Sequence, residues 1–372
     1  RSDVTAPNFL GQISTSHPNY KSYSGALQLR QPLLNMDGVA RYYQGIAQTN
    51  YSDAVFSSRS QDLLVRVFGA YVDAQYAEDQ LALSVAQRDT YAEQKRVNER
   101  MFAKGEGTKT DMLETQAKYD VAEAQLIEAN DNVTNARNVL ESIVGVKVLS
   151  LDALSSDFRV QPMQPAGLDD WREIALSNNA EILAQRQAVE SASQEVNKNR
   201  AGHLPRLDFV ASYAKNKSDT LNTLNQESTS RTVGIQLNVP IYSGGSVSAA
   251  TRQAVANLEK AKTDLEAKTK QVLVELRRQH SAVQSGSTKI DALTKSLKSA
   301  EALVEATRQS IKGGVRINLD LLSAEQQVFS ARRDLAQAKY TYLLSYLKLR
   351  NAAGTLGEND LRSVAGYFVA GR

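Results

Sequence analysis

Two aspartates are the clearest candidates for ligand chemistry in this 372-residue chain. Asp111 and Asp320 each follow a glycine by six residues, Gly105 and Gly314 respectively, and each stands at the start of a helical pattern. A carboxylate in the first turn of a helix stabilises that helix through the helix dipole. Carboxylates arranged in a ring bind and select cations. The position of the two aspartates predicts the first role, and their spacing by itself places no carboxylates in a ring.

The rest of the sequence offers no convincing catalytic constellation. His17, His203 and His280 lie far apart, without a second ligand at metal spacing, and the chain contains no cysteine. Residues 243–246 (Ser-Gly-Gly-Ser) lack the Gly-Lys-Ser/Thr of a phosphate cradle, so they are interpreted as a turn with a helix cap. We therefore expect no enzyme, no catalytic residues, no metal and no cofactor. The net charge of +3 gives no reason to expect nucleic acid as a partner.

These candidates lie in an internal duplication. Residues 104–113 return as residues 313–322, an offset of 209 at which the two glycines and the two aspartates coincide. Upstream, residues 27–33 return as residues 235–241 at an offset of 208. Two copies of roughly 200 residues indicate a fold with internal pseudo-symmetry.

Alternating side chains predict two antiparallel pairs of strands. Residues 232–241 place apolar side chains on one face and polar side chains on the other, and residues 207–213 repeat the pattern. The first copy offers residues 22–33, with a partner strand around residues 4–14. Such strands suit either an outer-membrane barrel or a half-buried sheet of a soluble protein. Because membrane barrels start at eight strands, four strands per chain could close one only if several chains contribute.

Two very long helices are also predicted. Residues 243–312 contain no proline, and apolar residues recur there every seven positions: Leu276, Val283, Ile290, Leu297, Val304 and Ile311. A helix of about 68 residues would be about 100 Å long. Its heptad seam needs neighbouring helices to bury it. Residues 37–103 are the first-copy counterpart, and after a Gly-containing turn each long helix is followed by a shorter one that ends at Gly145 or Gly354.

The elements divide the chain into four parts. We expect a first repeat over residues 1–145, an equatorial connector over 146–168, a second repeat over 169–354 and a C-terminal tail over 355–372. In the second repeat a helical stretch, residues 169–200, precedes the strands. Its first-copy equivalent falls before residue 1, so we expect a helix of roughly 35 residues, and any export signal, to precede the printed sequence.

Four motifs in this order resemble the TolC family of outer-membrane channel proteins. They are Leu204-Pro205-Arg206-Leu207 before a strand, Val239-Pro240-Ile241-Tyr242-Ser243-Gly244-Gly245 at a strand-to-helix junction, residues 312–322 at a helical tip, and Ala353-Gly354-Thr355-Leu356 after the last helix. The resemblance covers essentially the whole chain. Residues 31–35 and 40–44 look most like the family members that serve type I protein secretion.

The resemblance implies a mixed α+β membrane protein with long antiparallel helical hairpins and four strands per chain. Three chains would close a 12-stranded β-barrel in the bacterial outer membrane, continued by an α-barrel across the periplasm. The family is a passive duct that docks onto a periplasmic adaptor protein and an inner-membrane transporter. The implied role is therefore a homotrimeric exit duct for type I protein secretion. Its partners would be an ABC transporter, an exported protein and outer-membrane lipid, with no nucleic acid.

The resemblance also assigns roles to the two helical tips. Adaptor contact is implied for Gly105, Glu106, Gly107, Thr108, Gly314, Val315 and Arg316. Asp320 would face the lumen near a closed aperture, so that three chains contribute three carboxylates to one ring. Arg316 with Thr110 or Asp111 would hold the tip closed by charge-assisted hydrogen bonds. The family's second lumen aspartate is replaced here by Ser323, and its tyrosine latch by Ile311.

Three prolines are implied at the junctions between strands and helices. Pro32, Pro205 and Pro240 each stand near the end of a predicted strand. Proline cannot donate to a sheet ladder, so it suits such an exit, and we assign it a structural role only.

Two alternatives remain beside the secretion duct. The same fold could serve a multidrug efflux pump, which would change the cargo and the inner-membrane partner. A protein of another class, a soluble coiled-coil scaffold, would instead cover the apolar strand faces with protein.

Overall fold

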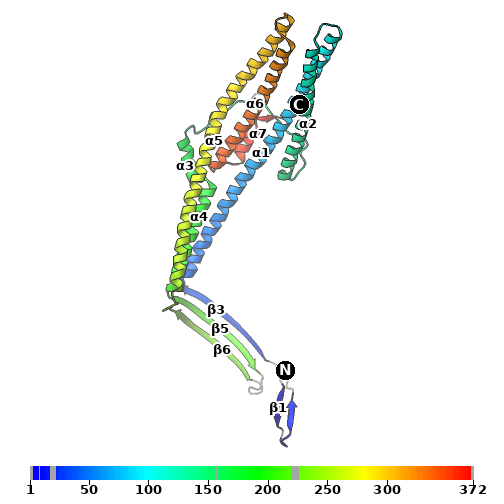
Figure 1. Ribbon diagram of the computed structural model, residues 1–372. Helices are drawn as coiled ribbons and strands as arrows, with labels where there is room; N and C mark the ends of the chain where they lie inside the picture. The colour runs from blue at the N-terminus through cyan, green and yellow to red at the C-terminus, as the bar shows by residue number, and fades with distance from the viewer. Residues whose placement is uncertain (1–2, 8, 17–21, 156–157, 219–225, 370–372) are drawn as a thin grey trace. The chain divides into compact units, whose positions relative to one another are not determined.

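The computed structural model describes residues 3–7, 9–16, 22–155, 158–218 and 226–369 (Figure 1). The chain divides into two compact units. One consists of Arg1–Thr49 with Gln187–Thr263, and the other of Asn50–Arg186 with Asp264–Arg372. Each unit draws on both halves of the duplicated sequence. The long strands lie in the first unit, and the hairpin tips and one short strand pair lie in the second.

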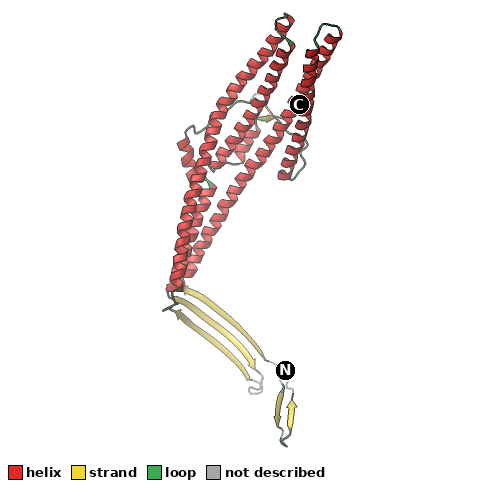
Figure 2. Ribbon diagram, in the orientation of Figure 1, coloured by secondary structure: helices red, strands yellow, loops and turns green. Residues whose placement is uncertain are grey.

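An antiparallel three-stranded sheet dominates the first unit (Figure 2). Its strands are β3 (Tyr23–Leu34), β5 (Arg206–Ser218) and β6 (Gln226–Asn238), in the order β3-β5-β6. Since successive side chains point to opposite faces, one face carries Leu27, Leu29, Phe209, Val233, Ile235 and Leu237. The other face carries Gln28, Arg30, Asp208, Ser212, Gln236 and Asn238. The predicted alternation is therefore confirmed for the second copy.

The expected first-copy strand pair is wrong. Residues 4–14 do not form one strand against β3. Instead, β1 (Val4–Pro7) and β2 (Ile13–Ser16) pair with each other. β3 pairs with β5, from Tyr23 opposite Lys217 to Leu34 opposite Leu207. Alternation defines the faces of a strand but not its neighbour, and the free edge of β5 can satisfy β3 along its whole length.

The long helices appear where the sequence predicts them. α1 (Met36–Ala103) has 68 residues and α5 (Ser246–Lys312) has 67. The shorter helices α2 (Lys109–Val144) and α6 (Asn318–Ala352) have 36 and 35 residues. The matched lengths confirm the duplication at the level of the fold. Alanines at 40, 47 and 254, none of them more than 5% exposed, line the part of the helices that belongs to the first unit.

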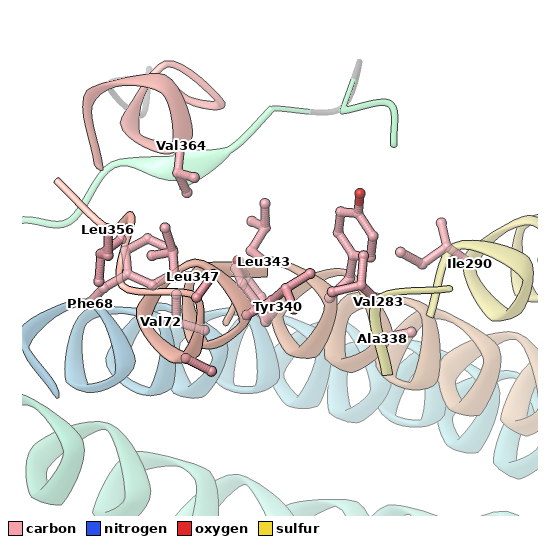
Figure 3. Close-up of a cluster of buried hydrophobic side chains, with 14 of the residues drawn as sticks. Phe68, Val72, Val283, Ile290, Ala338, Tyr340, Leu343, Leu347, Leu356 and Val364 are labelled. Carbon is pink, nitrogen blue, oxygen red and sulfur yellow. The ribbon is translucent and has the colours of Figure 1, made fainter. Parts of the chain in front are cut away.

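The main core of the second unit buries the heptad seam of α5. Leu276, Val283 and Ile290 are at most 5% exposed. They join one hydrophobic cluster with residues of α1 and α6 (Figure 3), among them Phe68, Val72, Leu343 and Leu347. Trp171 of α3 (Leu168–Asn178) completes this cluster, and its indole Nε1 donates to the Pro165 carbonyl at 2.7 Å. The seam therefore finds the neighbouring helices that its spacing requires.

The single helix expected over residues 169–200 is broken in the structure. α3 ends at Asn178, and α4 (Ala180–Arg200) begins after Asn179, whose φ and ψ of −62° and 121° are extended. The Asn179 side chain accepts from the Ile182 backbone N–H at 3.0 Å and donates to the Ala352 carbonyl at 2.9 Å. The amide thus caps α4 and ties it to the end of α6, which compensates for the interrupted helix. The short 3-10 helix η1 (Ala201–His203) then leads to β5.

Gly354 makes the matching contact from the other side of this break. It stands at φ 71° just after α6, where the Thr355 and Gly354 amides donate to the Arg350 and Asn351 carbonyls at 3.0 and 2.8 Å. This is a Schellman ending. A Cβ on Gly354 would lie 2.3 Å from the Asn178 carbonyl oxygen. Gly354 is therefore required by packing as well as by backbone conformation.

The connector and the tail pair with each other. β4 (Ala153–Leu154) and β7 (Phe368–Val369) form a short antiparallel pair, and α7 (Glu358–Ala365) precedes β7. The rings of Phe158 and Tyr367 meet edge to face with centroids 5.1 Å apart. The residues expected as a connector thus form part of the same core.

The two repeat-closing glycines provide a matched test. Gly145 also has a positive φ, 73°, but a Cβ there would meet nothing within 4 Å. Gly145→Ala should cost only the left-handed strain, about 1–2 kcal/mol. Gly354→Ala should cost at least about twice as much, because it adds a clash with backbone. Thermal unfolding followed by circular dichroism measures both variants, and equal losses would contradict the packing role of Gly354.

Candidate functional site: the paired helical tips

Both helical tips share one backbone motif. In the first, the Glu106 amide donates to the Met101 carbonyl at 2.9 Å and the Gly105 amide to Phe102 at 3.0 Å. In the second, the amides of Val315 and Gly314 donate to the carbonyls of Ser310 and Ile311 at 3.0 and 2.9 Å. These are Schellman endings, with Gly105 and Gly314 at φ 76° and 72°. The duplicated glycines therefore set two identical turns.

The two aspartates that follow these turns have different surroundings. Thr108 caps α2, since its Oγ1 accepts from the Asp111 amide at 3.0 Å and donates to Asp111 Oδ2 at 2.6 Å. The equivalent cap position of α6 is Ile317, which has no side-chain oxygen. Asp320 has no such capping partner, and its Oδ2 lies 3.5 Å from Arg316 Nη1. Asp111 is thus engaged in its own turn, whereas Asp320 forms an ion pair with the exposed Arg316.

The remaining tip residues are mostly exposed. Val315 is 81% exposed, and Gly105, Glu106, Thr108, Thr110, Gly314 and Arg316 are exposed as well, whereas Gly107 is half-buried. In the described part of the chain, the ion pair found for Arg316 joins it to Asp320 and not to Asp111. The structure thus brings Arg316 and Asp320 together within one tip. The pairing of Arg316 with Thr110 or Asp111 stays a prediction.

The three prolines lie at or near the strand ends. Pro205 directly precedes β5, and Pro240 follows the end of β6 by two residues. Pro32 lies inside β3, opposite Asp208, where the register shifts between Pro32 and Leu34. β3 is an edge strand of this sheet, and edges and bulges are the places where a strand tolerates proline.

A cleft of about 610 Å³ lies between the two tips. Apolar side chains from both hairpins line it: Val97, Met101, Ile311, Ile317 and Leu321. Its polar lining includes Gln94, Asn98, Asp111, Arg308 and Glu325. The cleft therefore lies where the α1–α2 hairpin meets the α5–α6 hairpin.

Glu325 connects the hairpins at this cleft, although it was not among the candidate residues predicted from the sequence. Its side chain is 9% exposed, it accepts a short hydrogen bond from Gln94 of α1, and Arg308 Nη2 of α5 lies 3.4 Å away. Burial raises the pKa of the Glu325 carboxyl, against the lowering effect of Gln94 and Arg308. A signal existed, because Glu325 lies three residues from both Leu322 and Val328 and so shares their buried helix face.

A second polar contact joins the hairpins further along. Tyr340 of α6 donates to Asp79 Oδ2 of α1 at 2.6 Å, and Tyr76 and Tyr340 meet edge to face at 6.0 Å. Burial raises the pKa of the Asp79 carboxyl, and burial with the Asp79 contact raises the pKa of Tyr340 strongly. The hairpins are thus connected by buried polar contacts at two levels.

The fold and the tips together define a class of protein. The chain combines an amphipathic sheet without a covering core, very long helical hairpins and exposed, Gly-turned tips. None of the described helices is apolar and long enough to traverse a bilayer. The amphipathic sheet, the long hairpins and their exposed tips are those of a channel protein assembled from several chains.

Similarity of the sequence to known proteins identifies the family. The chain matches the model of the outer membrane efflux protein family over residues 1–146 and 171–355. It is 45% identical to the alkaline protease secretion protein AprF of Pseudomonas aeruginosa, over the whole chain and 77% of that protein. It is 42% identical to the proteases secretion protein PrtF of Dickeya chrysanthemi, over 95% of this chain and 78% of that protein. The chain therefore belongs to the outer membrane efflux protein family, which includes TolC.

Solved structures have the same fold. The chain aligns with CusC at a TM-score of 0.80 and 19% identity, covering 95% of this chain and 81% of that one. It aligns with the Campylobacter jejuni CmeC outer membrane channel at a TM-score of 0.79 and 17% identity, covering 98% and 79%. The expected mixed fold of α-barrel helices and barrel strands is confirmed.

Family membership decides several expectations. The protein is an outer-membrane channel with a long periplasmic helical extension, and it is not an enzyme. The coiled-coil scaffold alternative is therefore wrong. Channels of this family are trimers that work with an adaptor and an inner-membrane pump.

The buried Glu325 predicts a pH dependence of stability. The pKa of the Glu325 carboxyl is raised in the folded protein, so folding favours its protonated form. Its contribution to the free energy of unfolding is therefore complete below the unfolded pKa of about 4.3 and is lost as the pH rises through the folded pKa. Glu325→Gln should reduce the loss of unfolding free energy with rising pH, by about 1.4 kcal/mol for each unit by which the folded pKa exceeds the unfolded pKa. Denaturant unfolding between about pH 4 and 8 measures it.

Glu305 supplies the control for this prediction. It is exposed on α5 and lies 3.9 Å from Arg308, the same arginine that faces Glu325. Glu305→Gln should leave the pH profile unchanged. If both variants keep the wild-type slope, burial of Glu325 does not govern the profile.

Proposed function

We propose that this chain is the outer-membrane exit duct of a type I system that secretes proteases. The observation that carries the proposal is the similarity over the whole chain to two protease secretion proteins, at 45% and 42% identity. Identity to the cation efflux protein CusC of Escherichia coli is only 20%, over 78% of this chain. The sequence thus diverges far more from an efflux channel than from the secretion channels.

The proposed working form is a homotrimer. Supporting it, β3 and β6 each have an unpaired outer edge in the described sheet, which a neighbouring chain could pair. The apolar sheet face would then meet lipid, and the polar face would line the water-filled passage.

The proposed partners meet the helical tips. A periplasmic adaptor would contact the exposed turns around Gly105 and Gly314, and an ABC transporter in the inner membrane would supply the energy. The duct itself would be passive. The exported protein would pass along the polar face of the sheet.

We propose further that Asp320 forms the acidic ring of the closed aperture. Three chains would bring three Asp320 carboxylates together, each beside its own Arg316. Repulsion between them would be reduced by the arginines, and cations would be attracted. In the assembled trimer, Arg316 would also reach Thr110 or Asp111 and hold the tips closed.

Secretion tests the cargo. When the gene is expressed in a strain that lacks its own protease-secretion duct but keeps the adaptor and transporter, extracellular protease activity should return. Resistance to small toxic compounds should not change. Restored drug resistance without secreted protease would favour the efflux alternative and contradict the proposal.

The Asp320 ring is tested by conductance, and the duplication supplies its control. In planar bilayers, Asp320→Asn should reduce selectivity for cations and block by divalent cations several-fold, since it removes three charges from one ring. Asp111→Asn removes a carboxylate that lies outside the proposed ring, so it should weaken the closed tip and raise the open probability but leave the cation selectivity of the open channel intact. An equal effect of both variants on selectivity would exclude a special role for Asp320.

A further inference from the structure

The apolar face of the three-stranded sheet changes character along its length. Near the helices, its rows pair Leu207 with Leu237 and Phe209 with Ile235. The next row places Ala211 between Leu29 and Val233. From Leu207 to Tyr213 this band runs six residues, about 20 Å along the strand.

Beyond that band, the same face becomes cationic and aromatic. Tyr213 lies opposite Leu27 and Arg231, Lys215 lies opposite Gly25 and Thr229, and Lys217 lies opposite Tyr23 and Glu227. These three rows carry three basic side chains and one acidic one. We name Tyr23, Tyr213, Lys215, Lys217 and Arg231 the outer patch.

Most side chains of the outer patch are exposed at the surface of the sheet, and two of its basic residues are oriented by neighbouring side chains. Tyr23 and Tyr213 are 55% and 45% exposed. The Arg231 guanidinium lies 5.8 Å from the centre of the Tyr213 ring, within reach of a cation–π contact. Lys215 Nζ lies 2.6 Å from Glu227 Oε1, which orients this lysine and leaves the patch with an excess of two positive charges.

The basic residues on the opposite face belong to a separate cluster. Arg30 and Arg206 both contact Asp208, whose side chain is 1% exposed. They lie at the end of the sheet nearest the helices. The outer patch is therefore an independent concentration of charge, on the lipid-facing side and at the far end of the strands.

We propose that the outer patch binds the phosphate groups of lipids in the outer leaflet of the outer membrane. The inference rests on the outer-membrane location and on the proposed placement of the apolar face against lipid. Because the helices extend into the periplasm, the far end of the strands meets the external leaflet. Apolar rows then contact acyl chains, tyrosines lie at the interface, and the cations reach the anionic headgroups just beyond them.

The test compares a phosphorylated lipid with its dephosphorylated form. Native mass spectrometry of the detergent-solubilised full-chain oligomer would measure binding of lipid A and of dephosphorylated lipid A. Wild-type protein should prefer the phosphorylated lipid. The triple variant Lys215→Gln, Lys217→Gln, Arg231→Gln should lose about fivefold in affinity per removed charge, or roughly a hundredfold in all.

A matched triple variant removes the same charge elsewhere. Lys262→Gln, Lys270→Gln and Arg278→Gln lie on α5, where each native residue pairs with a glutamate. This variant should keep the preference. The proposal is overturned if the outer-patch variant keeps it too, if the α5 variant loses it equally, or if inorganic phosphate at the same concentration displaces the lipid. The mass of the oligomer is read in the same spectrum, so a monomer would refute the proposed trimer and not the lipid site.

Discussion

The apolar seam of α5 is the constraint on which the rest of the structure depends. Leu276, Val283 and Ile290 cannot be covered by their own helix, so α1 and α6 must lie against them. That contact gathers Trp171, the connector and the tail into one core. Away from this core, α1–α2 and α5–α6 remain two hairpins. Between their tips they leave a cleft, bridged by polar contacts such as that of Glu325 with Gln94.

The two copies of the duplicated sequence have the same turn at the helical tip but differ in the residues that follow it. Gly105 and Gly314 produce the same backbone ending because only glycine accepts that conformation cheaply. One substitution, Thr108 in the first copy against Ile317 in the second, changes the chemistry that follows. Asp111 is engaged by its cap, whereas Asp320 forms an ion pair with the exposed Arg316. A duplicated backbone motif thus places two equivalent aspartates in different surroundings.

The three-stranded sheet also derives its two different faces from a sequence repeat, here one of two residues. Its two faces differ because alternate side chains point to opposite sides. In an outer-membrane channel, this alternation separates lipid from the passage. Along the apolar face, the side chains also change from apolar near Leu207 to basic and aromatic near Lys217. The two faces of one sheet would therefore contact lipid and the passage. If the outer patch binds lipid phosphates as proposed, the sequence along the strands also sets the depth of the sheet in the membrane.

The sequence by itself determined the duplication, the long helices with their Gly-turned tips, the alternation of the strands and the family. These signals are local, or repeat at a fixed spacing, so they can be read without knowing which elements meet. Only the tertiary structure decided the break at Asn179, the pairing of β3 with β5 and the burial of Glu325. Asn179 leaves the helix because its amide reaches Ala352, which is distant in the sequence. The spacing of Glu325 from Leu322 and Val328 indicates its helix face, but only the packed hairpins show that Gln94 and Arg308 cover it, because burial is a property of the packed pair and not of either helix alone.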